Sequence, residues 1–161
     1  HSMGGVLAGI LSTKFKEIKK VVFLNAAFTY LNFKQNKVDI LTNREYKDYV
    51  EVFDRVFHTS IPFFLEFVKL VKTHHDDLKN IDKDALILQS SKDQVVPIEN
   101  GIEIFDNIKS TNKCLTYIEN GRHAVFEGNG IEDERKKEIA EYIRLFLRGG
   151  RKWKMIKNDK I

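Results

Sequence analysis

The segment ALILQSSKDQVVP, residues 85–97, decides the fold class of this chain. Its first four residues, 85–88, are all apolar, and such a short continuous run is typical of a strand that is covered on both faces of a sheet. The polar residues that follow predict a loop directly after this strand. Two further runs, 21–24 and 114–118, have a similar apolar character and predict two more strands.

Helical patterns separate the predicted strands. Apolar residues recur at helical spacing within 98–108 and within 139–147, and the acidic residues 132–134 lie where negative charge favours a helix N-terminus. Short buried strands that alternate with amphipathic helices are joined by right-handed crossovers and build a parallel sheet. The sequence therefore predicts an α/β fold, with a parallel sheet flanked by helices.

Size and composition fit a single globular domain. The 161 residues are 42% hydrophobic and 31% charged, with a formal net charge of +4. The excess of positive over negative charge lies near the C-terminus, where we interpret residues 149–161 as a solvated basic tail. No basic stripe interleaved with aromatic residues occurs elsewhere in the sequence, so we expect no nucleic-acid partner.

Cysteine content and hydropathy bear on the compartment. The single cysteine, Cys114, cannot form an internal disulfide, so nothing in the sequence points to an oxidising compartment, and we expect a small buried thiol. No apolar run approaches the roughly 20 residues of a transmembrane helix. We therefore expect no stable membrane insertion and a cytoplasmic location.

The segment 28–80, between the first and second predicted strands, is longer than a single crossover requires. An apolar stripe within 46–57 predicts one helix. Thr59 or Ser60 is expected to cap a second helix, because Pro62 then occupies its first turn. An insertion of two helices at this point predicts a lid over the end of the sheet.

The second helix of this insertion carries apolar residues on two sides. One side is expected to pack on the domain, and the other to face a hydrophobic cavity. We call the second side the Phe63 row; it consists of Phe63, Phe67 and Leu70. The predicted organisation is an α/β core of residues 1–27 and 81–148, a helical lid of residues 28–80, and the basic tail.

Ser2, Asp93 and His123 are candidates for a catalytic site. Asp93 and His123 lie in loops after the second and third predicted strands, and Ser2 would join them if a strand preceded it. Functional residues of a parallel sheet gather beyond the carboxyl ends of its strands. Taken singly, each has an ordinary interpretation as a terminal, turn or loop residue. Together they have the residue types that acyl transfer through a serine nucleophile requires.

Two other polar clusters favour structural interpretations. Residues 74–77, His-His-Asp-Asp, suggest a metal site, but adjacent side chains on a helix diverge, so we expect a solvated helix end. Residues 128–130, Gly-Asn-Gly, predict a turn, because no lysine and serine follow them as a phosphate-binding loop requires. We expect no metal and no organic cofactor.

Three segments carry a resemblance to a known family: HSMGG at 1–5, LILQSSKDQVVP at 86–97 and YIENGRHAVFEG at 117–128. The chain resembles the C-terminal part of an α/β-hydrolase, similar to bacterial carboxylesterases and monoacylglycerol-lipase-like esterases. In that family the nucleophile motif usually reads Gly-His-Ser-Met-Gly-Gly, and the acid loop commonly ends in Asp-x-x-Val-Pro. The resemblance implies that the chain begins within the nucleophile elbow, with the N-terminal strands and on the order of 100 residues ahead of it.

The resemblance implies a serine hydrolase that cleaves carboxylic esters with short- to medium-chain acyl groups through an acyl-enzyme. Ser2 would attack the acyl carbon, His123 would transfer the proton, and Asp93 would orient His123. The N–H of Met3 would donate to the oxyanion. The Phe63 row would line the pocket of a small-molecule ester.

Other functions remain open at this stage. The same trio serves amide, thioester and acyl-transfer chemistry, and the sequence does not separate these reactions. The second interpretation is a non-catalytic scaffold, a truncated or degenerate α/β-hydrolase acting as an interaction domain. The presence of all three motif residues counts against degeneration. The sequence also leaves homo-oligomer formation open.

Overall fold

The computed structural model describes residues 1–28 and 61–149, together with the backbone of 156–160. The elements, in chain order, are α1 (Met3–Lys14), β1 (Lys20–Leu24), α3 (Ile61–His74), the 3-10 helix η1 (His75–Asn80), β2 (Asp84–Ser90), α4 (Glu99–Asn107), β3 (Lys113–Ile118), α5 (Asp133–Arg148) and β4 (Ile156–Lys160). The helix predicted within 46–57 lies outside the described residues, as do Thr59 and Ser60, the candidate caps of the second helix.

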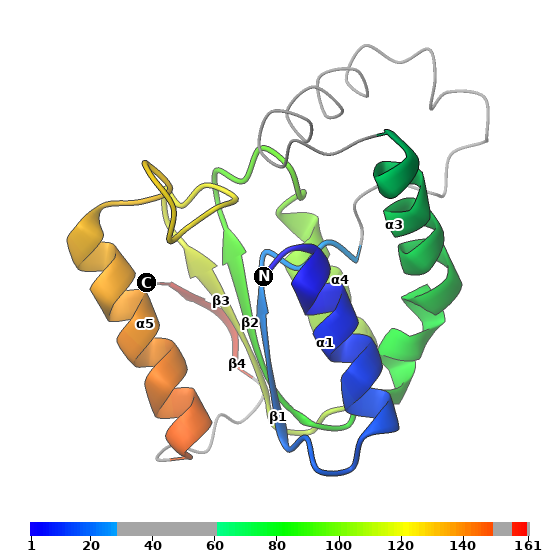
Figure 1. Ribbon diagram of the computed structural model, residues 1–161. Coiled ribbons are helices and arrows are strands. Elements are labelled where there is room, and N and C mark those ends of the chain that lie inside the picture. The colour runs from blue at the N-terminus through cyan, green and yellow to red at the C-terminus, as the bar shows by residue number, and fades with distance from the viewer. Residues whose placement is uncertain (29–60, 150–155, 161) are drawn as a thin grey trace.

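The described strands form one parallel sheet in the order β1-β2-β3-β4, and helices lie on both of its faces (Figure 1). Helices α1, α3 and α4 cover one face, and α5 covers the other. This arrangement confirms the predicted fold class, because the strands expected at 21–24, 85–88 and 114–118 pair in parallel register. Each helix in the described part of the chain is too short or too polar to cross a bilayer.

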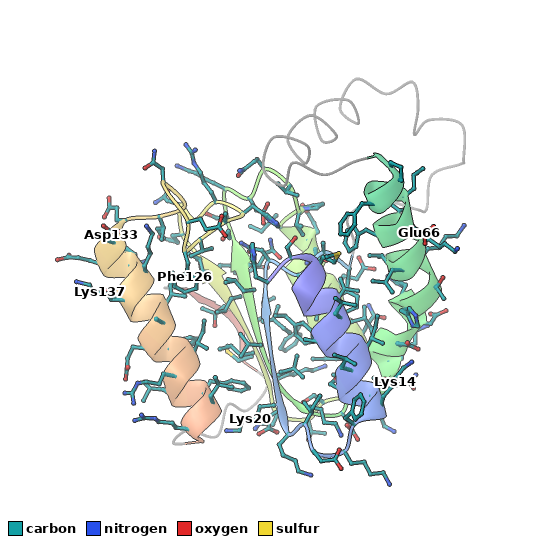
Figure 2. The ribbon with its side chains drawn as sticks, in the orientation of Figure 1. Lys14, Lys20, Glu66, Phe126, Asp133 and Lys137 are labelled. Atoms are coloured by element: carbon teal, nitrogen blue, oxygen red, sulfur yellow. The ribbon has the colours of Figure 1, made fainter. Side chains whose placement is uncertain are left out.

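Successive side chains of the strands point to opposite faces of the sheet, so the described residues form two hydrophobic cores. Side chains fill the layer between the sheet and the helices on each face (Figure 2). The α1-face core joins strand residues such as Phe23 and Ile87 to the three helices on that side. The α5-face core contains Cys114, whose buried thiol was expected, and the helix residues Ile139 and Phe146. Both faces of the sheet are therefore dry, which explains the continuous apolar runs of its strands.

The described part of the predicted lid, residues 61–80, packs against the α1-face core. Phe67 and Val71 of α3 and Leu78 of η1 are buried there, whereas Phe63 and Leu65 of α3 are exposed. Because Thr59 and Ser60 lie outside the described residues, the cap of this helix stays a prediction, as does the division of the chain into core, lid and tail.

The structure adds one strand that the sequence analysis did not expect. Residues 156–160 lie in the segment interpreted as a solvated basic tail, and their backbone pairs with β3 as β4. The sequence of this strand, IKNDK, lacks the apolar run that marks the other three. The backbone of this strand pairs with β3 at the edge of the described sheet, and its sequence has no apolar pattern that predicts this pairing.

Two glycines of α1 permit a close approach between this helix and its neighbours. A Cβ at Gly5 would overlap the Cβ of Ala26, and a Cβ at Gly9 would lie 2.8 Å from Cζ of Phe28. A Cβ at Gly4, on the exposed side of the same helix, would meet no atom within 4 Å. Helix α1 therefore rests directly on the chain that leaves β1.

We expect Gly5→Ala to lower the free energy of unfolding by about 1–3 kcal/mol, the usual cost of overpacking a close contact. Gly4→Ala is the matched control, and because alanine favours a helix it should leave stability unchanged or raise it by up to about 1 kcal/mol. Urea denaturation of both variants measures the difference. Equal stabilities would contradict a close contact between α1 and Ala26.

Candidate active site

The turn that holds Ser2 lies between the end of β1 and the start of α1. Ser2 has φ 49° and ψ −127°, a left-handed conformation that non-glycine residues rarely adopt. Its N–H donates to the carbonyl of Leu24 (3.1 Å), and its carbonyl accepts from the N–H of Gly5 (2.9 Å) and of Ala27 (3.3 Å). A strained turn that places a serine at a helix N-terminus is typical of a nucleophile elbow.

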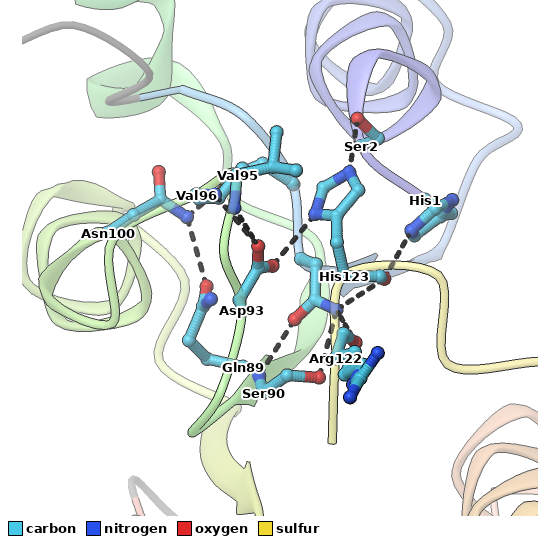
Figure 3. Close-up of polar contacts among 12 residues, drawn as sticks. His1, Ser2, Gln89, Ser90, Asp93, Val95, Val96, Asn100, Arg122 and His123 are labelled. Carbon is cyan, nitrogen blue, oxygen red and sulfur yellow. Dashed lines mark hydrogen bonds and ion pairs between the residues drawn. The ribbon is translucent and has the colours of Figure 1, made fainter. Parts of the chain in front are cut away.

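The structure brings Ser2, His123 and Asp93 together in one hydrogen-bonded chain (Figure 3). Nε2 of His123 lies 3.0 Å from Oγ of Ser2, and Nδ1 lies 2.8 Å from Oδ2 of Asp93. Since a carboxylate accepts, Nδ1 carries the proton, and Nε2 is left to accept from the serine hydroxyl. His123 is 0% exposed and Ser2 is 5% exposed, so the chain is shielded from water.

The loop after β2 fixes the carboxylate of Asp93. Its Oδ1 accepts from the backbone N–H groups of Val95 and Val96, each at 2.8 Å. This turn uses one carboxylate oxygen and leaves Oδ2 for His123 (Figure 3). An aspartate that stabilises its own turn is thereby held in a single orientation.

The loop after β3 carries His123 across the end of β2. A Cβ at Gly121 would lie 2.8 Å from both Cγ2 of Ile118 and Oγ of Ser90, so only glycine fits this position without displacement. The carbonyl of Gly121 accepts from the N–H of Lys92 at 3.0 Å. Gly121, two residues before His123, therefore lets the two loops meet.

Met3 and the Phe63 row share one groove. Met3 is the first residue of α1, and the first N–H groups of a helix have no acceptor within that helix. Phe67 is 3% exposed and Phe63 is 47% exposed, so the row runs from the inside of the groove to its rim. The groove has a volume of about 400 Å³ and is lined by Met3, Phe63, Glu66, Phe67, Lys69, Leu70, Thr73 and His74.

The sequence analysis missed two side chains at this site. Nε2 of His1 and Nδ2 of Asn25 both donate to the carbonyl of His123 at 2.8 Å (Figure 3). Asn25 directly follows β1, at the same edge of the sheet as Asp93. The rule that polar residues after parallel strands are functional would therefore have identified Asn25.

The other described polar clusters form side-chain pairs. His74 is bound to Asp77 (2.7 Å), and His75 to Glu103 (2.9 Å), on and beside η1. Within residues 1–28 and 61–149, no three His, Cys, Asp or Glu side chains are placed to hold a metal ion. A second cavity, of about 560 Å³ beside the N-terminus of α5, has none of Ser2, Asp93 and His123 in its lining.

The fold is that of an α/β-hydrolase. A sequence model of the family described as serine aminopeptidase, S33, matches residues 38–129, more than half of the chain. The chain therefore belongs to this family of α/β-hydrolases. The matched region includes Asp93 and His123. No curated protein matches the chain in a sequence search.

Solved structures share the fold at low sequence identity. A structure reported for the metagenome-derived lipolytic enzymes LipS and LipT is 19% identical, with a TM-score of 0.64 over 91% of this chain and 62% of its own. A 2,6-dihydroxy-pseudo-oxynicotine hydrolase is 17% identical, with a TM-score of 0.60 over 98% of this chain and 42% of its own. A meta-cleavage product hydrolase from Pseudomonas fluorescens is 17% identical, with a TM-score of 0.57 over 94% and 64%. The chain thus spans less than two thirds of the length of each.

Replacing Asp93 by asparagine tests the hydrogen-bonded chain. Asn keeps an oxygen for the N–H groups of Val95 and Val96, but its amide favours the wrong tautomer of His123. We expect the rate at which a fluorophosphonate labels Ser2 to fall by about 10³-fold or more. Asp82→Asn, which changes an exposed carboxylate paired with Lys83, is the matched control. Equal labelling rates in the two variants would show that Asp93 does not act on His123.

Proposed function

We propose that the protein is a serine hydrolase that cleaves carboxylic esters with short- to medium-chain acyl groups through an acyl-enzyme. The observation that carries this proposal is the 3.0 Å contact between Oγ of Ser2 and Nε2 of His123, continued at 2.8 Å to Asp93. Membership of the S33 family supports the hydrolase class.

In the first half-reaction, Oγ of Ser2 attacks the acyl carbon while its proton passes to Nε2 of His123. The imidazolium so formed is stabilised by Oδ2 of Asp93, which accepts the hydrogen bond from the Nδ1–H of His123. The carbonyl oxygen becomes an oxyanion and accepts from the N–H of Met3, where the dipole of α1 adds positive potential. Collapse of this intermediate expels the alcohol, which takes the proton from His123.

The second half-reaction reverses these roles with water as the nucleophile. Nε2 of His123 accepts a proton from water as its oxygen attacks the acyl carbon of the ester on Ser2. Collapse of the second tetrahedral intermediate releases the carboxylic acid and returns the proton to Oγ of Ser2. In both half-reactions, Ser2 and His123 are the protein side chains that exchange protons, and Asp93 holds His123 in place.

We expect the groove beside Met3 to bind the apolar acyl group of the substrate. The Phe63 row supplies aromatic and aliphatic surface, and a volume of about 400 Å³ suits a small molecule. The charged groups Glu66 and Lys69 are exposed and pair with each other at 3.8 Å, so they belong to the rim. The similar structure of lipolytic enzymes is consistent with this choice of substrate.

Two rival functions make different predictions. An amide hydrolase of the same family would turn over amino-acid p-nitroanilides faster than p-nitrophenyl esters. A non-catalytic scaffold would carry a serine that does not react with a fluorophosphonate, since only an activated serine does so. The buried contact between Ser2 and His123 favours an activated serine over a scaffold.

Ser2→Ala in the full-length protein tests the proposal directly. The wild type should hydrolyse p-nitrophenyl butyrate and react with a fluorophosphonate, and the variant should lose at least about 10³-fold in kcat because no acyl-enzyme can form. Thr111→Ala, which changes an exposed residue between α4 and β3, is the matched control and should retain full turnover. Turnover by the Ser2 variant at the wild-type rate would refute the assignment.

Leu70→Trp tests the groove. A larger side chain should block the end of the groove and leave room for fewer methylene groups, each worth about 0.8 kcal/mol when buried. We expect kcat/KM for p-nitrophenyl octanoate to fall by about tenfold relative to the butyrate ester. The matched control is Leu65→Trp on an exposed side of the same helix, which should leave this ratio unchanged. A ratio unaffected by Leu70→Trp would place the acyl group elsewhere.

A further inference from the structure

We infer that Asn25 is a positioning residue: it ties the backbone of His123 to the ends of β1 and β2 and so holds the imidazole between Ser2 and Asp93. Its effect on turnover rests on the proposed function. Its effect on the geometry of His123 does not.

The side chain of Asn25 is fully buried and uses both ends of its amide. Nδ2 donates to the carbonyl of His123 (2.8 Å) and to Oγ of Ser90 (2.9 Å), with the carbonyl of Arg122 at 3.3 Å. Oδ1 accepts from the N–H of Ser90 at 2.8 Å. The side chain of Asn25 thus joins the last residue of β2 to the loop that carries His123.

The backbone of Asn25 directs this side chain across the sheet edge. Its N–H donates to the carbonyl of Leu88 at 2.8 Å, which continues the pairing of β1 with β2, and its φ is 45°. Asparagine tolerates the left-handed region better than most residues. Aspartate tolerates it too but lacks the Nδ2 donor, and glycine tolerates it but has no side chain.

The requirement for this tether comes from the geometry of proton transfer. The bonds of His123 to Ser2 and to Asp93 are made by two nitrogens of one ring, so both depend on where the backbone holds that ring. A displacement of about 1 Å in a catalytic group typically costs about 10²-fold in rate. The N–H of Val125 and Nε2 of His1 also donate to the carbonyl of His123, but of these described donors Asn25 is the one that also binds β2.

Asn25→Gly and Asn25→Asp in the full-length protein test the inference. The first keeps the backbone conformation and removes the tether; the second keeps the acceptor for the N–H of Ser90 and removes the donor. Both should lower kcat for p-nitrophenyl butyrate by about 10- to 100-fold, with KM changed by less than about threefold. The matched control is Asn120→Gly, at an exposed position with φ 60°, which should leave kcat unchanged.

A readout independent of turnover is the low-field proton resonance of the hydrogen bond between Nδ1 of His123 and Asp93. It should broaden or disappear in both Asn25 variants and persist in the Asn120 variant. In a double-mutant cycle with His123→Ala, Asn25→Gly should have no further effect on fluorophosphonate labelling of Ser2, since Asn25 acts through His123.

The outcomes separate the two proposals. A wild type without esterase activity would reject the proposed function, and the proton resonance would still decide the role of Asn25. If the wild type is active and the Asn25 variants keep both the proton resonance and the wild-type kcat, the inference about Asn25 is overturned and the proposed function is not. Variants that lose only folded protein, with wild-type kcat per serine labelled by the fluorophosphonate, would also overturn it, because Asn25 would then serve stability only.

Discussion

Parallel pairing of the strands is the constraint on which the site depends. The in-register pairing of β1 with β2, which ends at Leu24 and Leu88, brings the carboxyl ends of neighbouring strands to one edge. The chain leaving each strand therefore enters the same small region. Asp93 and His123 arrive there from the ends of β2 and β3, and Ser2 is fixed to the end of β1 by its own N–H. Residues more than 100 positions apart meet without any covalent link between them.

Burial makes the partners of His123 essential rather than optional. An imidazolium without access to water is stable only where a carboxylate and hydrogen-bond acceptors compensate for its lost hydration. The side chains of His123 and Asp93 are both inaccessible to solvent, so their attraction acts at low effective dielectric. The same burial requires donors for the His123 carbonyl, which His1 and Asn25 provide. Burial of His123 therefore requires the hydrogen bonds that surround it.

Much of the fold could be predicted because it is encoded in apolar periodicity, which marks both the buried strands and the amphipathic helices. Asp93 and His123 could be located because each follows such a strand. Asn25 also follows such a strand, but a single asparagine does not by itself indicate which groups it binds, and its partners lie far away in sequence. The left-handed backbone of Ser2 and the pairing of residues 156–160 were missed for a related reason. Both depend on main-chain geometry that tertiary contacts impose.

Of the two cores on opposite faces of the sheet, only one lies beside the groove. The groove is built from α1 and α3, which belong to one face only. The core under α5, with Leu86, Ile139 and Phe146, contributes nothing to that groove. With the groove as the proposed acyl site, random variation in this second layer can be screened for heat resistance without altering the residues that line the groove. Selection acting on preference has the opposite layer to work with, so the two traits can evolve with little mutual interference.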